Sequence, residues 1–381
     1  MDREFQIFVK PASAWCNLRC SYCYYLEKKA LYPGGGIQRM ADELLEKYIV
    51  QHIEASTDDF IMFSWHGGEP TLAGIDFFRK AVRLQKKHLP SGYLIINGIQ
   101  TNGTLLDDSW CRFFSDENFL VGISIDGPQE FHDKYRVTSE GGSTFSKVMH
   151  GYDLLRKHRV ATEILCVLNS FNSGHPLPVY NFFKGLGAEY MTFLPLVERQ
   201  SDSDSGVTPA SVDPLAYGNF LIQVFDEWMV KDIETVQIQI FEETAHTAFG
   251  QEHIVCIFKA ACGGVPVVEY NGDFYSCDHF VDSEHLVGNI NDMSLAGLLD
   301  SPVQKAFGEA KLLKLPRYCR ECDVLEMCNG ECPKNRFILT PDGEPGLNYL
   351  CPGYKLFFSH SKPFVETLRL LWLNKQQETS N

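Results

Sequence analysis

The sequence lacks three features that would each indicate a broad class of protein. No run of about 18 apolar residues occurs, so no membrane-spanning segment is expected. Basic residues are in the minority, with 34 Lys+Arg against 49 Asp+Glu. Nucleic-acid binders need clustered positive charge, so no nucleic-acid partner is expected. The first residues, Met1-Asp2-Arg3-Glu4, do not form the apolar core of a signal peptide. We therefore expect a cytoplasmic protein.

Cysteine, in contrast, is abundant. The 13 cysteines are Cys16, Cys20, Cys23, Cys111, Cys166, Cys256, Cys262, Cys277, Cys319, Cys322, Cys328, Cys332 and Cys351. An odd number of cysteines in a cytosolic chain disfavours a disulfide framework, because cytosolic thiols are kept reduced. Short fixed spacings instead indicate metal ligation. The two isolated cysteines, Cys111 and Cys166, are expected to be small buried hydrophobes.

Short β-rich runs alternate with helical patterns over the first 200 residues. The predicted strands are Phe5–Val9, Phe60–Trp65, Leu94–Gln100, Leu120–Ile125, Ala161–Leu168 and Tyr190–Leu196. The predicted helices are Asp42–Ala55, Asp76–His88, Asp107–Ser115, Phe145–Lys157 and Pro178–Lys184. This alternation predicts an α/β fold whose parallel sheet has helices outside. Six units are too few for a complete eight-stranded barrel, so a partial barrel or an open doubly wound sheet remains. Both folds place the active site at the C-terminal ends of the parallel strands.

The rest of the chain divides by composition. We expect a β/α domain over 1–200 and a connector with helices over 201–250. A cysteine-rich domain with little helical periodicity should follow over 251–355, and small domains of this kind usually need metal to fold. Residues 356–381 should form a closing helix and a tail that frays from Asn374.

Cys16, Cys20 and Cys23 form a Cys-x3-Cys-x2-Cys triplet directly after the first predicted strand. Three thiolates can hold three irons of a 4Fe–4S cluster and leave the fourth iron open for a cofactor or substrate. The alternative is three buried or zinc-binding cysteines.

The triplet, with the aromatic Tyr22 before its last cysteine, resembles the signature of the radical S-adenosylmethionine (SAM) superfamily. The resemblance implies a partial (β/α)6 TIM-like barrel that binds SAM. It assigns Gly68, in a Gly-Gly-Glu-Pro segment, to the methionine amino group, and Ser124 to the carboxylate or ribose. Arg136 would bind the carboxylate, or else be a solvated surface charge. Tyr22 would also contact the cofactor, and Val197 would offer a backbone contact to adenine.

The C-terminal cysteines resemble the SPASM extension of radical enzymes that modify peptides. This resemblance implies two auxiliary 4Fe–4S clusters, for a total of three. Auxiliary cluster I would be held by Cys256, Cys262, Cys277 and Cys332. Auxiliary cluster II would be held by Cys319, Cys322, Cys328 and Cys351. Because Cys-x2-Cys pairs also bind zinc, two four-cysteine zinc sites are the alternative.

Asp278 follows the predicted ligand Cys277, and on its own it could be an ordinary turn residue. Longer segments resemble the anaerobic sulfatase-maturating enzymes. They are Val9–Pro11, Gly67–Gly74, Gln100–Leu105, Leu120–Pro128, Tyr275–Phe280, Cys328–Arg336 and Leu347–Cys351. This resemblance makes Asp278 the proton acceptor of the reaction. It also makes Tyr25 a contact for the substrate peptide, the alternative being packing at the barrel mouth.

The activity implied is oxidation of a Cys or Ser side chain in a sulfatase to Cα-formylglycine. The target would be a Cys/Ser-x-Pro-x-Arg segment, and the electron donor a ferredoxin or flavodoxin. One alternative is another SPASM enzyme that forms a thioether or carbon–carbon crosslink in a peptide. Two further alternatives are an electron carrier without chemistry and a zinc-stabilised protein-binding module.

Overall fold

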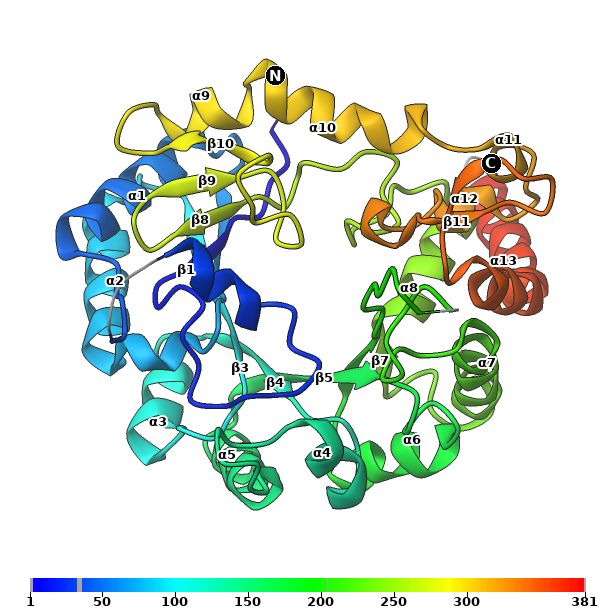
Figure 1. The fold of residues 1–381 in the computed structure, drawn as a ribbon, viewed down its shortest axis with the longest axis horizontal. Helices are drawn as coiled ribbons and strands as arrows, with labels where there is room; N and C mark the ends of the chain where they lie inside the picture. The colour runs from blue at the N-terminus through cyan, green and yellow to red at the C-terminus, as the bar shows by residue number, and fades with distance from the viewer. Residues whose placement is uncertain (1–2, 33–35, 204, 380–381) are drawn as a thin grey trace. The chain divides into compact units, whose positions relative to one another are not determined.

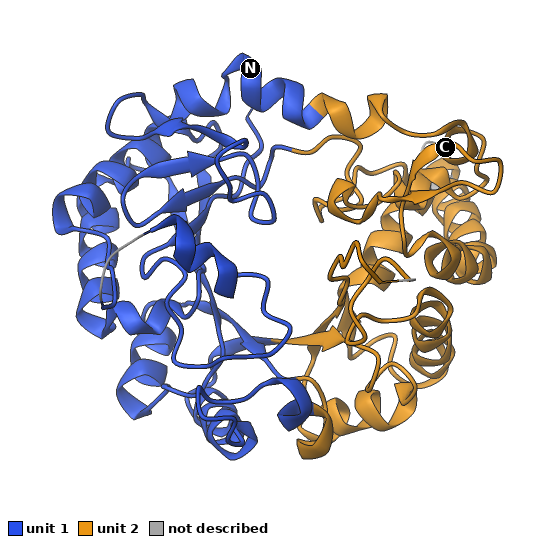
Figure 2. Cartoon of the chain, in the orientation of Figure 1, with its two compact units in different colours: residues 1–125, 132–163, 263–308 blue, residues 126–131, 164–262, 309–381 orange. Residues whose placement is uncertain are grey.

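The computed structural model describes residues 3–32, 36–203 and 205–379, and these fall into two compact units (Figure 2). Unit 1 comprises Met1–Ile125, His132–Glu163 and Gly263–Gly308. Unit 2 comprises Asp126–Phe131, Ile164–Cys262 and Glu309–Asn381. Residue 204 of the predicted connector and residues 380–381 of the predicted tail lie outside the described residues.

Unit 1 is built on a mixed, mostly parallel sheet with the strand order β10-β9-β8-β1-β2-β3-β4 (Figure 1). The strands are β1 (Phe8–Lys10), β2 (Phe60–Trp65), β3 (Leu94–Thr101), β4 (Leu120–Ser124), β8 (Val267–Glu269), β9 (Asp273–Tyr275) and β10 (Leu286–Asn289). Strands β1 to β4 are parallel, and β8 joins the other side of β1 in parallel. Strands β9 and β10 continue the sheet in antiparallel pairs.

The helices of unit 1 follow the strands in the predicted alternation. They are η1 (Leu26–Leu31), α1 (Asp42–Ala55), η2 (Pro70–Ala73), α2 (Ile75–His88), α3 (Asp108–Asp116), α5 (Phe145–Lys157) and α9 (Leu295–Leu299). Helix α1 forms because its apolar residues recur at helical spacing, and it buries Leu45, Tyr48 and Ile49 completely. Trp65 is also fully buried, and its indole N–H donates to Asn97 Oδ1 at 2.9 Å.

Unit 2 contains β6 (Tyr190–Pro195) parallel to β7 (Gln237–Ile238), with most of β5 (Ala161–Leu168). Its helices are α6 (Pro176–Gly185), α7 (Pro214–Lys231), α8 (Gln239–His246), η3 (Thr247–Phe249), α11 (Arg317–Arg320), α12 (Leu325–Cys328), η4 (Pro333–Asn335) and α13 (Cys351–Thr379). A hairpin pairs β11 (Ile338–Leu339) with β12 (Pro345–Leu347). Helices α4 (Gln129–Tyr135) and α10 (Pro302–Leu313) have residues in both units.

Helices α7 and α13 cross at two glycines, and this crossing places the start of α13. A Cβ on Gly353 would lie 2.0 Å from the carbonyl oxygen of Pro214, and one on Gly218 would lie 2.6 Å from that of Gly353. Only glycine permits such a close approach between helix backbones. Cys351 is the first residue of α13, so the crossing also fixes a predicted cluster ligand.

The predicted strands and helices of the first half are confirmed to within a few residues, although β1 is shorter than predicted. The statement that 251–355 has little helical periodicity is wrong for α10, a helix of 12 residues with Pro302 at its first position. The compact units also divide the chain differently from the predicted domains, because pairing of β8 with β1 joins residues 263–308 to the first half.

Neither set of strands closes into a barrel within the described residues. Helix α13 continues to Thr379, beyond the predicted start of the tail. Over the part of the chain that the structure describes, no helix is both long and apolar enough to cross a membrane. Cys111 and Cys166 are fully buried, as predicted.

Candidate active site

The triplet loop leaves the end of β1 and is held by the chain that precedes α5. The backbone N–H of Arg19 donates to the carbonyl of Val137 at 2.9 Å, and that of Ser21 donates to Tyr135 at 2.9 Å. These two bonds bracket Arg136 and bring it beside the triplet. The predicted SAM contact Arg136 therefore lies at the triplet loop, although it is more than 100 residues away in sequence.

Arg136 is buried, so the alternative of a solvated surface charge is wrong. Its guanidinium carbon lies 5.5 Å from the centre of the Tyr22 ring, close enough for a cation–π contact. The two residues predicted to contact SAM from this side are thus in contact with each other. A buried guanidinium in this position can form charge-assisted hydrogen bonds to a carboxylate.

The sulfur of Cys16 is surrounded by N–H donors. It accepts from the backbone N–H of Leu18 at 3.3 Å and from Asn102 Nδ2 at 3.6 Å. Burial, with a smaller contribution from the charge of Glu69, raises the pKa of the Cys16 thiol to about 12. Without a metal this thiol stays protonated, and iron must displace its proton. The two donors favour the thiolate that results, so the residues fit a cluster ligand.

Glu69 joins the loops that follow β2 and β3. It is fully buried, and its Oε1 accepts from Thr71 N at 3.0 Å and from the hydroxyls of Thr71 at 2.6 Å and Thr101 at 2.8 Å. Its Oε2 accepts from Asn102 N at 2.7 Å. Burial raises the pKa of Glu69, and these four donors oppose that effect. Glu69 thereby positions Asn102, whose amide reaches Cys16. In the sequence, Glu69 was noted only as part of the Gly-Gly-Glu-Pro segment, and no role of its own was predicted for it.

Gly68 packs directly against the residue that precedes the triplet. A Cβ at this position would lie 2.2 Å from the carbonyl oxygen of Trp15. The Gly68 N–H donates to Ser13 at 2.8 Å, and the Glu69 N–H donates to Trp15 at 2.8 Å. Any larger residue must displace the triplet loop. Ser124, at the end of β4, is partly exposed and accepts from Gln100 Nε2 at 3.1 Å.

Asp278 lies beside Lys10 because of strand register. Lys10 ends β1 opposite Glu269 at the end of β8, and β9 returns antiparallel to β8 and ends at Tyr275. Lys10 is 1% exposed, and its ammonium group forms an ion pair with Asp278. The hydroxyl of Tyr24 donates to the other carboxylate oxygen. Asp278 does lie in a turn, as the alternative reading has it, but its side chain also belongs to a partly buried polar cluster with Lys10 and Tyr24.

The charges around Asp278 determine its protonation. Burial would raise the pKa of Asp278, but Lys10, His279 and Tyr24 together hold it well below its ordinary value. Asp278 is therefore ionised at neutral pH, as a proton acceptor must be. Burial raises the pKa of the neighbouring Glu269 to about 7.

Tyr25 is a core residue in this structure. It is 2% exposed, and its hydroxyl donates to Glu269 Oε1 at 2.6 Å. The Lys10 ammonium lies 4.6 Å from the centre of its ring. The packing alternative therefore describes Tyr25, and the exposed member of the aromatic pair is Tyr24, which is 44% exposed. Neither Lys10 nor Tyr24 was predicted as a site residue, although Lys10 lies in the quoted segment Val9–Pro11 and Tyr24 directly precedes Tyr25.

In unit 2 the four cysteines predicted to hold auxiliary cluster II line one cavity. Cys319, Cys322, Cys328 and Cys351 share it with Tyr318, Val324, Leu325, Gly330, Tyr354 and Lys355. Burial raises the pKa of both Cys328 and Cys351 to about 12, so here too a metal must displace protons. Four thiols around one mostly apolar cavity fit the ligand set of a cluster.

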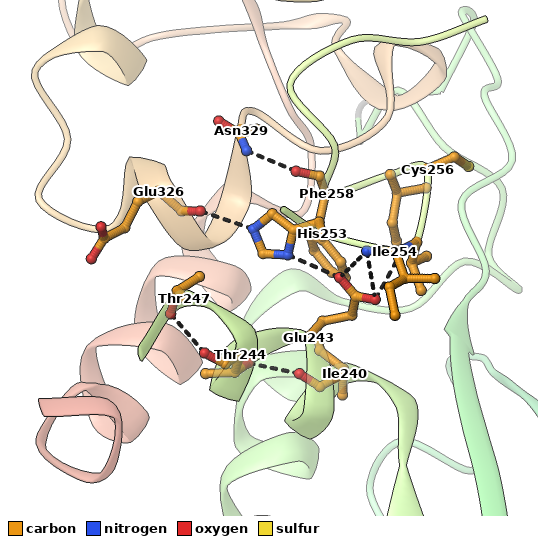
Figure 3. A network of polar contacts seen from close by, with 12 residues as sticks. Ile240, Glu243, Thr244, Thr247, His253, Ile254, Cys256, Phe258, Glu326 and Asn329 are labelled. Atoms are coloured by element: carbon orange, nitrogen blue, oxygen red, sulfur yellow. Dashed lines mark hydrogen bonds and ion pairs between the residues drawn. The ribbon is translucent and has the colours of Figure 1, made fainter. Parts of the chain in front are cut away.

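Hydrogen bonds hold the loop that carries Cys256 on both sides of that cysteine (Figure 3). Glu243 on α8 is buried and accepts from His253 Nδ1 at 2.9 Å and from the Val255 N–H at 2.9 Å. His253 Nε2 donates to the carbonyl of Glu326 at 2.9 Å. Asn329 Nδ2 donates to the carbonyl of Phe258 at 2.8 Å. The loop of Cys256 is thus tied to the chain on either side of Cys328.

Three of the predicted ligands of auxiliary cluster I, Cys256, Cys262 and Cys332, belong to unit 2, and Cys277 belongs to unit 1. Val197 also belongs to unit 2, where its carbonyl accepts from Lys334 Nζ at 2.9 Å. Its contact with adenine stays a prediction. Among the described residues, no three Cys, His, Asp or Glu side chains converge on one point where a single metal ion could be held.

Comparison with known proteins identifies the class. Residues 11–176 match the model of the radical SAM superfamily, and residues 262–323 match that of an iron–sulfur cluster-binding domain named SPASM. A serine-type anaerobic sulfatase-maturating enzyme of Bacteroides thetaiotaomicron is 47% identical over 98% of this chain and 93% of that protein. A cysteine-type enzyme of Clostridium perfringens is 35% identical over 94% of this chain and 96% of its own length.

A solved structure described as native anSMEcpe with bound AdoMet and a peptide superposes with a TM-score of 0.86 at 34% identity. It covers 96% of this chain and 98% of the other. The two matched domains imply a SAM-binding 4Fe–4S cluster together with auxiliary clusters. The protein is therefore a radical SAM enzyme with a SPASM extension. Within that class, the chain belongs to the family of anaerobic sulfatase-maturating enzymes.

The close contact at Gly68 generates a prediction about the triplet cluster. Gly68→Ala should lower the affinity for the SAM-binding cluster by about tenfold or more, because the new methyl group displaces the carbonyl of Trp15 next to Cys16. Iron content and the spectrum of the reduced cluster measure this effect. Gly98→Ala in β3 is the matched control, since its Cβ would meet no atom closer than 4.0 Å. Equal iron content in the two variants would contradict the prediction.

Proposed function

We propose that this enzyme oxidises the Cβ of a cysteine or serine in a sulfatase segment Cys/Ser-x-Pro-x-Arg to Cα-formylglycine. The observation that carries the proposal is the Lys10–Asp278–Tyr24 cluster, which holds an ionised carboxylate directly after the predicted ligand Cys277. Relatives that match over nearly the whole chain are named serine-type and cysteine-type anaerobic sulfatase-maturating enzymes, which supports the proposal.

Cys16, Cys20 and Cys23 would hold the cluster that binds SAM, and the chemistry supplied there would be radical abstraction of a hydrogen atom from the target carbon. The surrounding residues hold the cofactor in place. Arg136 and Ser124 would bind the methionine carboxylate or the ribose, with Tyr22 packed against the guanidinium. Gly68 would offer its backbone to the methionine amino group.

Asp278 would take the thiol or hydroxyl proton of the target residue. Its low pKa makes it a weak base toward an ordinary hydroxyl. Loss of the Cβ hydrogen atom acidifies that proton, and loss of one electron from the resulting radical makes it strongly acidic, so transfer to the carboxylate is favourable when the proton and the electron leave together. Tyr24 is exposed and already bonded to Asp278, so we assign it to the substrate-facing side of the cluster. The electron released would pass to the auxiliary clusters, held by the two ligand sets predicted from the sequence.

We further propose a low-potential ferredoxin or flavodoxin as electron donor and the cytoplasm as the location, because a reducing compartment preserves these clusters. The competing activity is formation of a thioether or carbon–carbon crosslink by the same class of enzyme. The cluster at Asp278 favours side-chain oxidation, because it provides a proton acceptor for the heteroatom that becomes a carbonyl.

Product analysis on two matched peptides tests the activity. With SAM and dithionite under anaerobic conditions, the serine and cysteine forms of the same peptide should yield products of identical mass. The serine form loses two hydrogens, and the cysteine form also exchanges its sulfur for oxygen after hydrolysis. Both products should react with a hydrazine. Retention of sulfur in the cysteine product, with no hydrazine adduct, would indicate a crosslink and contradict the proposal.

Asp278→Asn tests the base. Peptide oxidation should fall by about 100-fold or more, because a general base contributes roughly that factor, while 5′-deoxyadenosine still forms. Asp282→Asn, which removes the same charge four residues away, should retain oxidation. An unchanged oxidation rate in Asp278→Asn would contradict the assignment.

The ion pair between Lys10 and Asp278 generates a separate prediction about pH. In Lys10→Met the acid limb of the pH–rate profile should move to higher pH, since loss of the ammonium raises the pKa of Asp278.

A further inference from the structure

Unit 2 contains a lysine that is buried among the predicted cluster ligands without a carboxylate partner. Lys311 on α10 is 1% exposed. Its ammonium group donates to the carbonyl of Cys256 at 3.1 Å and to that of Ile257 at 2.7 Å. In the part of the chain that the structure describes, no carboxylate lies within ion-pair distance of this nitrogen. Lys311 therefore places a positive charge on the loop that carries a predicted ligand of auxiliary cluster I.

A second cation extends this positive region. Arg336 donates through Nη1 to the carbonyl of Lys311 at 2.5 Å and through Nε to that of Gly330 at 2.8 Å. Its Nη2 donates to the carbonyls of Asn329 and Glu331, each at 3.0 Å. The two cations thus connect the loop of Cys256 to the turn between Cys328 and Cys332.

The nearby acidic group is already engaged by neutral partners. Glu331 is 2% exposed, and its carboxylate accepts from the amides of Asn335 at 3.1 Å and of Asn348. Burial lowers the pKa of Lys311, and the neighbouring thiols of Cys262 and Cys256 act in the opposite direction. A buried ammonium group is costly unless an anion compensates it. A 4Fe–4S cluster with four thiolates carries a net charge of about −2 and would provide that anion.

We propose that Lys311 raises the reduction potential of the auxiliary cluster held by Cys256 and Cys262. Reduction adds one negative charge to the cluster, and a fixed positive charge beside it stabilises the reduced form. The target residue loses one electron and one proton after its hydrogen atom has been abstracted. Asp278 would accept the proton, and the oxidised cluster held by Cys256 and Cys262 would accept the electron. Lys311 makes that electron transfer more favourable.

The positive charge is held in a fixed position. The clamp of Glu243 and His253 and the bond from Asn329 to Phe258 hold the 253–258 loop on both sides of Cys256 (Figure 3). Lys311 donates to two carbonyls inside this held segment. A preorganised charge of this kind needs little reorganisation when the cluster is reduced. Lys311 is thus a positioning residue that acts through the cluster. The inference rests on the ligand assignment proposed above.

The midpoint potential of the auxiliary clusters tests the inference. The full chain with Cys16→Ala, Cys20→Ala and Cys23→Ala retains the predicted auxiliary ligands, so redox titration followed by electron paramagnetic resonance reports them alone. Adding Lys311→Met should lower one midpoint potential, and Lys311→Arg should leave it near the parent value. Lys314→Met removes an equal charge from an exposed position three residues away, and it should have no effect because solvent screens that charge.

The outcomes separate charge from packing. Unchanged potentials in Lys311→Met, or equal shifts in Lys311→Met and Lys311→Arg, would overturn the proposal. If Lys311→Met loses iron, its iron content is compared with that of Lys311→Arg. Retention of iron in Lys311→Arg supports the role of the positive charge, and loss of iron in both variants overturns the proposal. Potentials are measured without peptide, so failure to form formylglycine would refute the proposed function and leave this result intact.

Discussion

Compensation of buried charge is the constraint on which this structure depends. An ionised group away from water is tolerated only with a counter-charge or several hydrogen-bond donors. Glu69 meets this requirement with four donors, and Asp278 meets it with Lys10 and Tyr24. Lys311 shows the reverse case, a buried cation beside thiols that become anionic when they bind iron.

In unit 1, the pairing of strands brings the charges that compensate one another together. Residues 263–308 are distant from β1 in sequence, yet β8 pairs with β1 and places Lys10 opposite Glu269. The return strand β9 then leads to Cys277 and Asp278 within three residues. A base placed by strand pairing is held by many backbone hydrogen bonds, and this gives it the rigidity that a catalytic site requires.

Much of the fold was predictable from the sequence because apolar residues recur with clear periods. Helix α1 was predicted to the residue, and the alternation of strands and helices indicated a parallel sheet. Cys319, Cys322, Cys328 and Cys351 line one cavity, and the family resemblance had grouped the same four cysteines.

The remainder depended on contacts between distant segments, which have no local signal. Nothing around Lys10 or Asp278 in sequence indicates that they pair. Tyr24 and Tyr25 are adjacent and identical in type, and only packing decides that Tyr25 is buried and Tyr24 exposed. Helix α10 was missed because the cysteine-rich region was judged as a whole, although residues 302–313 contain one glycine and no cysteine.

We expect the buried thiols and their compensating charges to serve three iron–sulfur clusters. Metal and sulfide analysis of the anaerobically reconstituted chain, beside the triple alanine variant of the triplet, tests this most directly. The wild-type chain should contain about twelve iron and twelve sulfide, and the variant about eight of each. Stoichiometric zinc without sulfide, or an iron content that is equal in the two proteins, would contradict it.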